Sequence, residues 1–280
     1  EFLISFLSVT RCGAIAAPLN PTYTSSEFEF YIKDANSSYL IVKDQDNTSV
    51  AAAQNANLNV IAVGVSKTGL SLNDLKGELT HARAPEYVSD ETVALFLHTS
   101  GTTSKPKGVP LTHRNLLASL SNIINTYNLS EADTSIVVMP LFHVHGLIGV
   151  ALSTLASGGC LVLPNRFSAS TFWKIQSDMN ATWYSAVPTI HKILLDRADS
   201  DGAPYQSFRF IRSCSSPLSK EILLGVESRF GSPVLEAYGM TEAAHQMSSN
   251  KLPPFERHPG SVGTPTGVEI SVRGETGIEL

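Results

Sequence analysis

The sequence predicts an α/β fold in which parallel β-sheets are flanked by helices. Along the first third of the chain, apolar segments of strand length alternate with segments of helical spacing, and the connections between them are short. Hydrophobic residues make up 42% of the 280 residues and charged residues 16%, which is typical of a globular protein with a sizeable core. This length suits one large domain or two small ones.

The first third contains three expected helices and three expected strands. Gly13 is the expected end of the first helix, and the capping box Thr24–Glu27 begins the second. Residues 64–92 form a polar connection with a strand or turn inside it. The expected helices cover residues 1–12, 24–35 and 49–56, and the expected strands cover residues 14–17, 39–42, 60–63 and, after the connection, 93–97.

The rest of the chain repeats the alternation without an internal repeat or a linker that divides it into two clear domains. Pro110 and Thr112 are expected to open an amphipathic helix, and Pro188 another. After Glu242 the chain is expected to be rich in loops. The expected helices cover residues 112–127, 147–155, 170–179, 188–195 and 219–230, and the expected strands cover residues 136–139, 160–163, 183–187, 208–213, 234–238 and 268–272.

Charge and composition exclude several classes of function. The net charge of −5 gives no reason to propose nucleic acid or an anionic membrane as a partner. No apolar stretch has the length of a membrane span. The cysteines Cys12, Cys160 and Cys214 have no metal-site spacing and suit a reduced intracellular compartment. The chain begins at Glu1 inside an apolar helix and ends without a closing element, so we expect a fragment.

A loop of hydroxyls, glycines and lysines covers residues 99–108, between the strand at 93–97 and the helix at 112–127. A strand, a polar glycine loop and a helix form the layout of a phosphate cradle. The loop is not a Walker A motif, because Pro106 stands where that pattern needs glycine five positions after Gly101. A P-loop kinase is therefore disfavoured. The alternative for a polar loop of this composition is a flexible surface loop.

A second motif, Tyr238-Gly239-Met240-Thr241-Glu242, follows a buried strand. Ligands of open α/β sheets lie at the carboxyl ends of strands. There Tyr238 can stack on a purine, Thr241 can bind phosphate, and Glu242 can hold Mg²⁺ through oxygen. Taken alone, the motif is also compatible with a strand, a glycine turn and a helix cap.

Both long motifs resemble signatures of the acyl-adenylate-forming enzymes, the AMP-dependent synthetase/ligase family. Residues 99–108 are similar to the phosphate-binding signature of that family, and residues 238–242 to the pentapeptide at its nucleotide site. Residues 212–218, Arg-Ser-Cys-Ser-Ser-Pro-Leu, resemble the segment that lines the adenine and acyl pockets, but carry hydroxyls where Gly and Ala are usual. His143 follows the Pro-Leu-Phe turn, at the mouth of the acyl pocket in the family. His98 is expected to serve packing.

Within the family, the chain is similar to the oxalate–CoA ligase branch of plants and fungi, near the coumarate–CoA ligases. The stretches that carry this resemblance are residues 17–20, 27–31, 140–147, 181–184, 186–191 and 210–215. The resemblance implies the large N-terminal domain of an adenylate-forming enzyme, with layers in an αβαβα arrangement, truncated at both ends. Residues 1–280 would be a partial AMP-binding domain, and the small C-terminal domain would be absent.

The implied activity is that of an ATP-dependent acid–CoA ligase. A small carboxylate, oxalate in this branch, would become an acyl-adenylate and then a CoA thioester, with release of pyrophosphate and AMP. The implied partners are the carboxylate, ATP with Mg²⁺, and CoA, without nucleic acid, in the cytoplasm or the peroxisome. The alternatives are a coumarate or other acyl-CoA ligase, and a non-catalytic nucleotide-binding remnant. The fragment alone is expected to be inactive.

The resemblance also implies site residues, which fall into four groups. Thr241, Glu242 and His143 are the expected catalytic residues, and Glu242 the metal ligand. The expected substrate-binding residues are His143, Ser213, Ser215 and His245, and a metal site built on His143 and His145 lacks a third ligand. The expected nucleotide-binding residues are Thr99, Ser100, Gly101, Thr102, Thr103, Lys105, Lys107, Gly108, Ser215, Glu236, Ala237, Tyr238 and Gly239.

Overall fold

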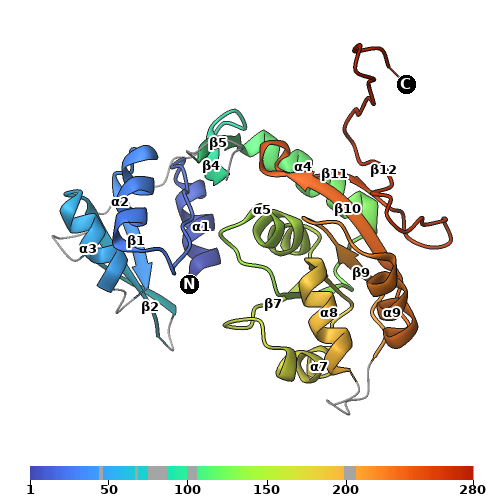
Figure 1. Ribbon diagram of the computed structural model, residues 1–280. Coiled ribbons are helices and arrows are strands. Elements are labelled where there is room, and N and C mark those ends of the chain that lie inside the picture. Colours follow the sequence, from blue (N-terminus) through green and yellow to red (C-terminus); the bar gives the residue numbers. More distant parts are fainter. Residues whose placement is uncertain (44–46, 67–68, 75–86, 100–105, 199–205, 280) are drawn as a thin grey trace. The chain divides into compact units, whose positions relative to one another are not determined.

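A computed structural model describes residues 1–43, 47–66, 69–74, 87–99, 106–198 and 206–279 of the chain (Figure 1). The chain divides into two compact units, Glu1–Arg114 and Asn115–Leu280. The boundary falls in the first turn of helix α4 (His113–Tyr127) and not in a linker. Among the described residues, no helix has the length and apolar character that a membrane span requires.

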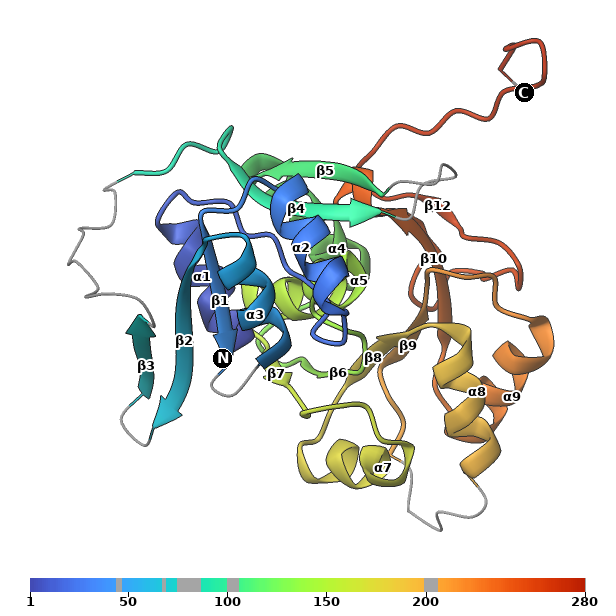
Figure 2. The same cartoon turned by 60° about the vertical axis from the view of Figure 1, so that its left-hand side comes forward.

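The first unit contains a small sheet with β1 (Tyr39–Lys43), β2 (Asn59–Ser66) and β3 (Gly69–Asp74). Strand β2 pairs in parallel with β1 and antiparallel with β3, which lies beside it in Figure 2. The expected strand within the connection at 64–92 is therefore confirmed as β3. The helices of this unit are α1 (Phe2–Arg11), α2 (Ser25–Asp34) and α3 (Asn47–Asn55).

Helices α2 and α3 share a core with the sheet. The predicted capping box is confirmed, because the Thr24 side chain accepts from the Glu27 N–H and the Glu27 carboxylate accepts from the Thr24 N–H. The buried residues of this core are Phe28, Ile32, Val42, Ala52, Ala53, Leu58, Val60 and Ala62.

The glycine loop connects two strands, so the predicted order of strand, loop and helix is wrong. Strand β4 (Val93–Thr99) pairs antiparallel with β5 (Lys107–Thr112), and α4 begins only after β5. Val109 and Leu111 are buried while Pro110 is exposed, which is the alternation of a strand. In a pair of two strands, Pro110 disrupts no central ladder. The strand expected at 14–17 is reduced to a single bridge from Ala16 to β4.

The second unit is built on a seven-stranded sheet with the order β12–β11–β10–β9–β8–β6–β7. From β7 to β10 neighbouring strands are parallel, as the alternation of elements predicts. The parallel strands are β6 (Thr134–Val137), β7 (Cys160–Val162), β8 (Trp183–Ala186), β9 (Phe210–Ser213) and β10 (Val234–Met240).

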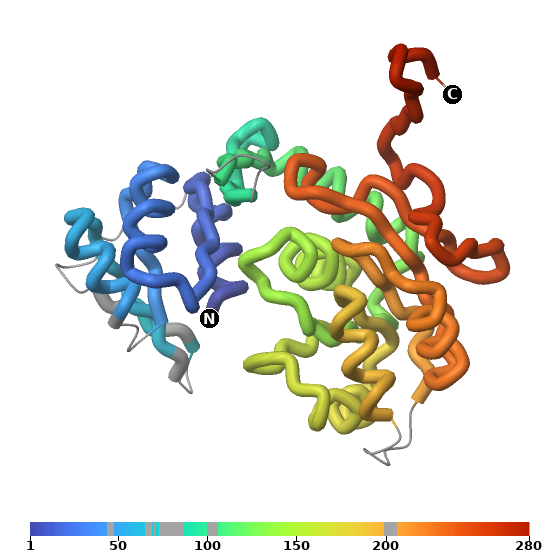
Figure 3. The backbone as a smooth tube through the Cα atoms, in the orientation of Figure 1, coloured from blue at the N-terminus to red at the C-terminus, as the bar shows by residue number. Residues whose placement is uncertain are grey.

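The two remaining strands correct the sequence prediction. After Glu242, where loops were expected, β11 (His245–Ser249) turns back and pairs antiparallel with β10, followed by the short β12 (Thr264–Pro265). The strand expected at 268–272 is absent from the described residues there, and in Figure 3 the red trace after β12 is irregular chain. The side chains of that segment are mostly exposed, so no core favours a strand.

Helices cover both faces of this sheet. Tyr184 and Ile211 point into a core with α7 (Ala169–Asp178), α8 (Pro188–Arg197) and α9 (Lys220–Phe230). Their strand neighbours point to the opposite face, where the ring of Tyr127 from α4 stacks on that of Phe210 at 5.0 Å. This alternation is what a strand covered on two faces requires.

A continuous helix over residues 144–156 also lies on this second face. It consists of α5 (Val144–Gly146), a π-helical segment (Leu147–Leu152) and α6 (Ser153–Ala156), and it confirms the buried helix predicted there. At one end His145 bonds Ser185 of β8, and at the other Thr154 bonds Ser135 of β6. π-helical segments are frequent at functional sites.

Candidate functional site

The polar residues of the second unit gather at the carboxyl ends of its parallel strands. Ser185 lies in β8, Ser213 ends β9 and Ser215 follows it. The segment 238–242 ends β10 and continues into a short 3₁₀ turn, Thr241–Ala243. In α/β sheets this edge is where ligands bind.

Three residues near this edge have a backbone conformation that residues other than glycine rarely adopt. The φ angle is +74° at Ser215, +50° at Ala244 and +98° at His245. The other non-glycine residues with positive φ among the described residues are Asn36, Asn57, Asn128 and Asn180. Asparagine tolerates this conformation, whereas serine, alanine and histidine are strained in it. Strain of this kind concentrates at functional sites.

The Tyr238 motif presents an exposed tyrosine beside a tight backbone contact. Tyr238 is 47% exposed at the end of β10, while Glu236 and Ala237 of the same strand are buried. A Cβ on Gly239 would lie 1.9 Å from the His245 carbonyl oxygen, so only glycine fits where β11 bulges against β10. Burial raises the pKa of Glu236, whose carboxylate accepts from the Gly260 N–H at 2.9 Å.

Thr241 and Glu242 lie on the turn that follows this strand. Thr241 is half-buried, and the Glu242 carboxylate is exposed and forms no salt bridge among the described residues. No group of three or more potential metal-ligating side chains occurs in the described part of the chain. A metal ion at Glu242 would therefore need oxygen ligands from a bound molecule, which is how Mg²⁺ binds with nucleotide phosphates.

Two buried histidines lie behind this edge. The Nδ1 atom of His145 is 3.0 Å from Ser215 Oγ, and its Nε2 atom is 2.7 Å from Ser185 Oγ. The ring of His245 stacks on that of His145 with centroids 5.3 Å apart. Burial lowers the pKa of both imidazoles well below the usual value, and the charge of Arg212 adds to this effect. Both rings are therefore neutral near pH 7.

The packing of His245 depends on Gly149 in the π-helical segment. A Cβ at Gly149 would lie 2.4 Å from His245 Nε2. That nitrogen and Ser213 Oγ are buried without a hydrogen-bond partner among the described residues. Unpaired buried polar atoms are uncommon, and their position at the strand ends is consistent with polar contacts that a ligand completes.

Arg212 of β9 is fully buried behind the histidines. Its guanidinium donates to the Tyr127 hydroxyl at 2.8 Å, to Ser185 Oγ at 3.0 Å and to Gln246 Oε1 at 3.0 Å. All three acceptors are neutral, and the salt bridges of the described residues do not include Arg212. A buried cation without a counter-ion creates a positive potential at this end of the sheet.

His143 lies just before the helix at 144–156, with its ring 4.6 Å from that of Phe142. The residue is exposed, although partial desolvation of its ring lowers its pKa. Its neighbour His145 contacts Ser215 and Ser185, and the catalytic role expected of His143 stays a prediction. The contacts of Ser185 and Arg212 at this edge were not predicted, although an arginine within the apolar segment 208–213 was a visible signal.

The residues predicted on the glycine loop lie in the first unit or outside the described residues. Ser100, Gly101, Thr102, Thr103 and Lys105 lie outside the described residues. The described neighbours Thr99, Lys107 and Gly108 lie at the end of the β4–β5 pair that adjoins the loop, where Lys107 is exposed. The packing expected of His98 is confirmed, because its ring contacts those of Tyr31 and Phe96, and its Nε2 also lies 2.8 Å from Asp34 Oδ2.

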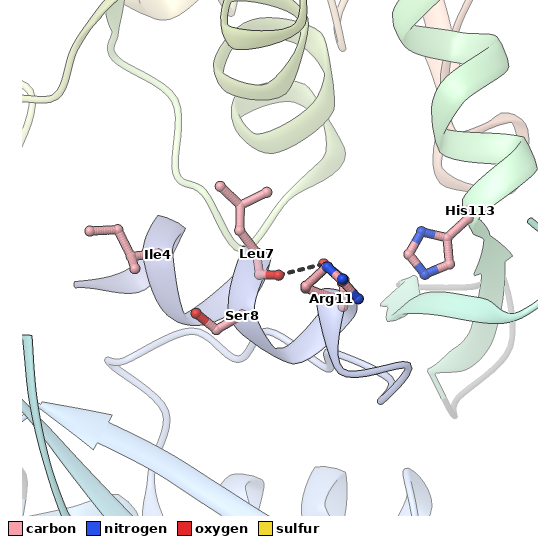
Figure 4. A pocket seen from close by; sticks show the side chains of 6 residues that line it. Ile4, Leu7, Ser8, Arg11 and His113 are labelled. Atoms are coloured by element: carbon pink, nitrogen blue, oxygen red, sulfur yellow. Dashed lines mark hydrogen bonds between the residues drawn. The ribbon is translucent and has the colours of Figure 1, made fainter. Parts of the chain in front are cut away.

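A shallow hollow of about 530 Å³ lies on the first unit, apart from the predicted residues (Figure 4). Its lining is mainly the face of α1 around Leu7, with His113 from the start of α4. None of the residues predicted from the motifs lines it, so it takes no part in the candidate site.

An α/β sheet with strained polar residues, a neutral histidine pair and an exposed tyrosine at its carboxyl edge defines a ligand-binding α/β enzyme scaffold. The family model for AMP-binding enzymes matches residues 1–280. The chain belongs to the AMP-binding enzyme family, as the resemblance of its motifs predicts.

Relatives and solved structures agree with this assignment. The chain is 49% identical to the oxalate–CoA ligase of Arabidopsis thaliana and 49% identical to a protein of Humulus lupulus named a probable CoA ligase, over 99% and 97% of its length. It spans about half of those relatives, 55% and 54%. The crystal structure of ATP-bound MatB from Rhodopseudomonas palustris matches this chain over its whole length, at 26% identity and a TM-score of 0.81. The match covers 55% of the MatB chain. The predicted α/β fold of an adenylate-forming N-terminal domain is thereby confirmed.

Proposed function

We propose that the full-length protein containing this chain is an ATP-dependent acid–CoA ligase whose acid is a small polar carboxylate, oxalate. The observation that carries the proposal is the polar character of the carboxyl edge. There the exposed Ser215 contacts the buried His145, and Arg212 lies deeper in the same network of hydrogen bonds. An apolar acid such as a fatty acid would gain nothing from this surface and would leave its polar groups unpaired. The identity to an oxalate–CoA ligase supports the same acid.

The reaction proceeds in two displacements. A carboxylate oxygen attacks the α-phosphorus of ATP, and pyrophosphate leaves. The sulfur of CoA then attacks the acyl carbon, AMP leaves, and the thiol proton passes to solvent. The first step joins two anions, so cations and hydrogen-bond donors around the phosphates lower its barrier.

Residues of the described chain have distinct roles in this proposal. The exposed ring of Tyr238 stacks on the adenine, and Glu236, Ala237 and Gly239 support that segment. Thr241 donates to phosphate oxygen, and the Glu242 carboxylate is a ligand of Mg²⁺. When bound, the ion would neutralise charge on the phosphates, and the exposed Glu242 carboxylate, which has no salt bridge among the described residues, fits it. The lysines of residues 99–108, Lys105 and Lys107, stay the predicted source of further positive charge.

The acid is held by polar groups on the strand ends. Ser213 ends β9 and Ser215 follows it, while His245 begins β11 and His143 precedes the helix at 144–156. Ser213 Oγ and His245 Nε2 have no partner among the described residues, which leaves them ready for polar contacts with a second carboxylate. CoA is the second substrate and enters after the adenylate has formed.

The test is AMP release by the full-length protein with ATP, Mg²⁺ and CoA. Oxalate, coumarate, acetate and a medium-chain fatty acid are supplied separately. We expect release with oxalate at least tenfold faster than with the others. Faster release with coumarate or a fatty acid would overturn the choice of acid and keep the ligase. ATP binding without AMP release for any acid would favour a nucleotide-binding protein without ligase activity.

A further inference from the structure

The Arg212 guanidinium sets the direction of a chain of hydrogen bonds that leads to the exposed edge. Arginine has donors only, and at 0% exposure Arg212 has no access to water. It therefore donates to Ser185 Oγ, and this contact uses an acceptor site of the hydroxyl and never its proton. The next bond in the chain has to use that proton.

Ser185 has one further side-chain partner among the described residues, which is His145. Their atoms Oγ and Nε2 are 2.7 Å apart. If Ser185 accepted here as well, its proton would be left buried without an acceptor, which is costly. Ser185 therefore donates to Nε2, and this requires Nε2 to be without a proton.

A neutral His145 with an unprotonated Nε2 carries its proton on Nδ1. Nδ1 lies 3.0 Å from Ser215 Oγ, so His145 donates to Ser215. The Ser215 hydroxyl then accepts from within the protein, and its own proton has no acceptor among the described residues. Because Ser215 is exposed, that proton is free to bond solvent or a ligand.

We propose that Arg212 is a positioning residue that, through Ser185 and His145, fixes the Ser215 hydroxyl as a hydrogen-bond donor to the carboxylate of the acid substrate. This inference rests on the proposed function for the identity of the ligand. A carboxylate only accepts hydrogen bonds, so a donor of fixed direction favours it over groups that need an acceptor. The backbone strain at Ser215 is then explained, because it brings the hydroxyl to the end of the chain of bonds.

The neutral state of His145 agrees with this direction. Burial lowers the pKa of His145, and the positive charge of Arg212 lowers it further. The groups that face His145 are Arg212, His191, His143 and the stacked ring of His245, and none of them is an acid. A protonated imidazole would donate at both nitrogens and force Ser185 to direct its proton elsewhere.

The first measurement is the tautomer of His145 in the full-length protein without substrate. Nitrogen-15 NMR of histidine-labelled protein distinguishes the two neutral tautomers, and the signal is assigned by its loss in His145→Gln. We expect the proton on Nδ1. A proton on Nε2 would overturn the inference whatever the activity of the protein is.

The second measurement compares Ser185→Ala with Ser135→Ala. Ser135 is the matched control, because it is a buried serine on the neighbouring strand whose hydroxyl lies 2.9 Å from Thr154 Oγ1, outside the chain of bonds. In Ser185→Ala we expect the Nδ1 preference to weaken and the KM for oxalate to rise about tenfold, with a smaller change in kcat. In Ser135→Ala both stay as in the wild type.

Each outcome separates this inference from the proposed function. An unchanged tautomer and KM in Ser185→Ala would overturn the relay while oxalate-dependent AMP release still supports the ligase. Absence of AMP release with every acid in the wild type would overturn the function and the ligand assigned to Ser215. A similar rise of KM in both serine variants would assign the effect to general packing and also overturn the relay.

Discussion

Arg209 and Arg212 lie at opposite ends of strand β9, and their guanidinium groups are stabilised in opposite ways. At the amino end, Arg209 is paired with both oxygens of Asp133 at 2.9 Å and donates to the Tyr127 carbonyl oxygen. At the carboxyl end, Arg212 is more deeply buried and contacts only neutral groups.

This difference in partners indicates that the amino end of the strand serves stability and the carboxyl end serves a ligand. In the bidentate ion pair each charge is balanced by the other, and the remaining hydrogen bonds of Arg209 and Asp133 go to protein groups. An arginine among neutral acceptors leaves a positive potential and a directed set of hydrogen bonds, which a structural site does not need. The predictions below test this contrast by disturbing one end at a time.

Acidification is expected to have the largest effect, and to act on the carboxyl end. Burial lowers the pKa of His191, which lies near Ala186 and Arg212, to about 4. Between pH 6.5 and 4 the unfolded chain binds a proton that the folded chain does not, so stability is present above pH 6.5 and is lost as the pH falls. His191 alone contributes on the order of 3 kcal/mol, and His145 and His245 act in the same direction.

The measurement is the thermal unfolding midpoint of the full-length protein from pH 7.5 to 4.5. The His191→Gln variant is the control, because it removes the titrating group and should flatten part of the slope. A midpoint that stays constant down to pH 5, or an equal slope in the variant, would contradict the prediction.

Loss of the charge at the amino end should mainly reduce stability. Arg209→Met leaves the buried Asp133 carboxylate with the Ser130 N–H and the Thr182 hydroxyl as its remaining donors. We expect the free energy of unfolding to fall by about 2–3 kcal/mol. This is less than for a fully buried ion pair, because the Arg209 side chain is 34% exposed. Urea denaturation measures it, and KM should stay within about twofold because the substrate edge is untouched.

Arg212→Met is the counterpart at the carboxyl end. It removes an uncompensated buried charge and leaves neutral partners, so stability should fall by less than in Arg209→Met. The KM for the acid should rise about tenfold, as in Ser185→Ala. A larger loss of stability in Arg212→Met than in Arg209→Met would break the contrast between the two ends.

Gly149→Ala disturbs the carboxyl end through packing alone. The added Cβ would overlap His245 Nε2, so the imidazole has to move or the π-helical segment has to shift. Such overpacking costs about 1–2 kcal/mol, and we expect the KM for the acid to rise with it. Gly225→Ala provides a matched control on α9, since its Cβ would meet the flexible side chain of Leu195. Equal kinetic effects of the two variants would contradict a role for His245.

Ser215→Gly should have the smallest effect on stability, and with the opposite sign. Glycine adopts the φ of +74° without strain, so the variant should be about 1 kcal/mol more stable. Activity should nevertheless fall, because the hydroxyl that the acid contacts is gone. A variant that is less stable, or one with unchanged kinetics, would argue against strain held for function.

Local signals allowed much of the fold to be predicted. The capping box at Thr24 and the end of α9 at Gly231, where φ is +61°, depend on residues close in sequence, and both are confirmed. The hairpin at β5 was missed because Pro110 is typical of a helix start, and only its pairing with β4 shows a strand. Strand β11 was missed because its buried residues are polar, and Gln246 among them is satisfied by the distant Tyr127 hydroxyl.

The candidate site was predictable only where a motif is contiguous. Tyr238, Thr241 and Glu242 lie together on one segment, so their grouping could be read from the sequence. The contact of His145 with Ser185 and Ser215 joins three separate elements, and no local pattern announces it. The assignments of residues to nucleotide and acid stay predictions for the experiments above.

The π-helical segment has a consequence for how this site can change over time. His145 and Thr154 are nine positions apart, and in a regular α-helix that separation is about two and a half turns, which would place them on opposite sides. The wider π turns let both side chains anchor to the same sheet. Deleting one residue from Leu147–Leu152 would rotate one anchor by roughly 100° relative to the other. A single lost codon would thus separate either His145 from Ser185 or Thr154 from Ser135 without changing a residue of any strand.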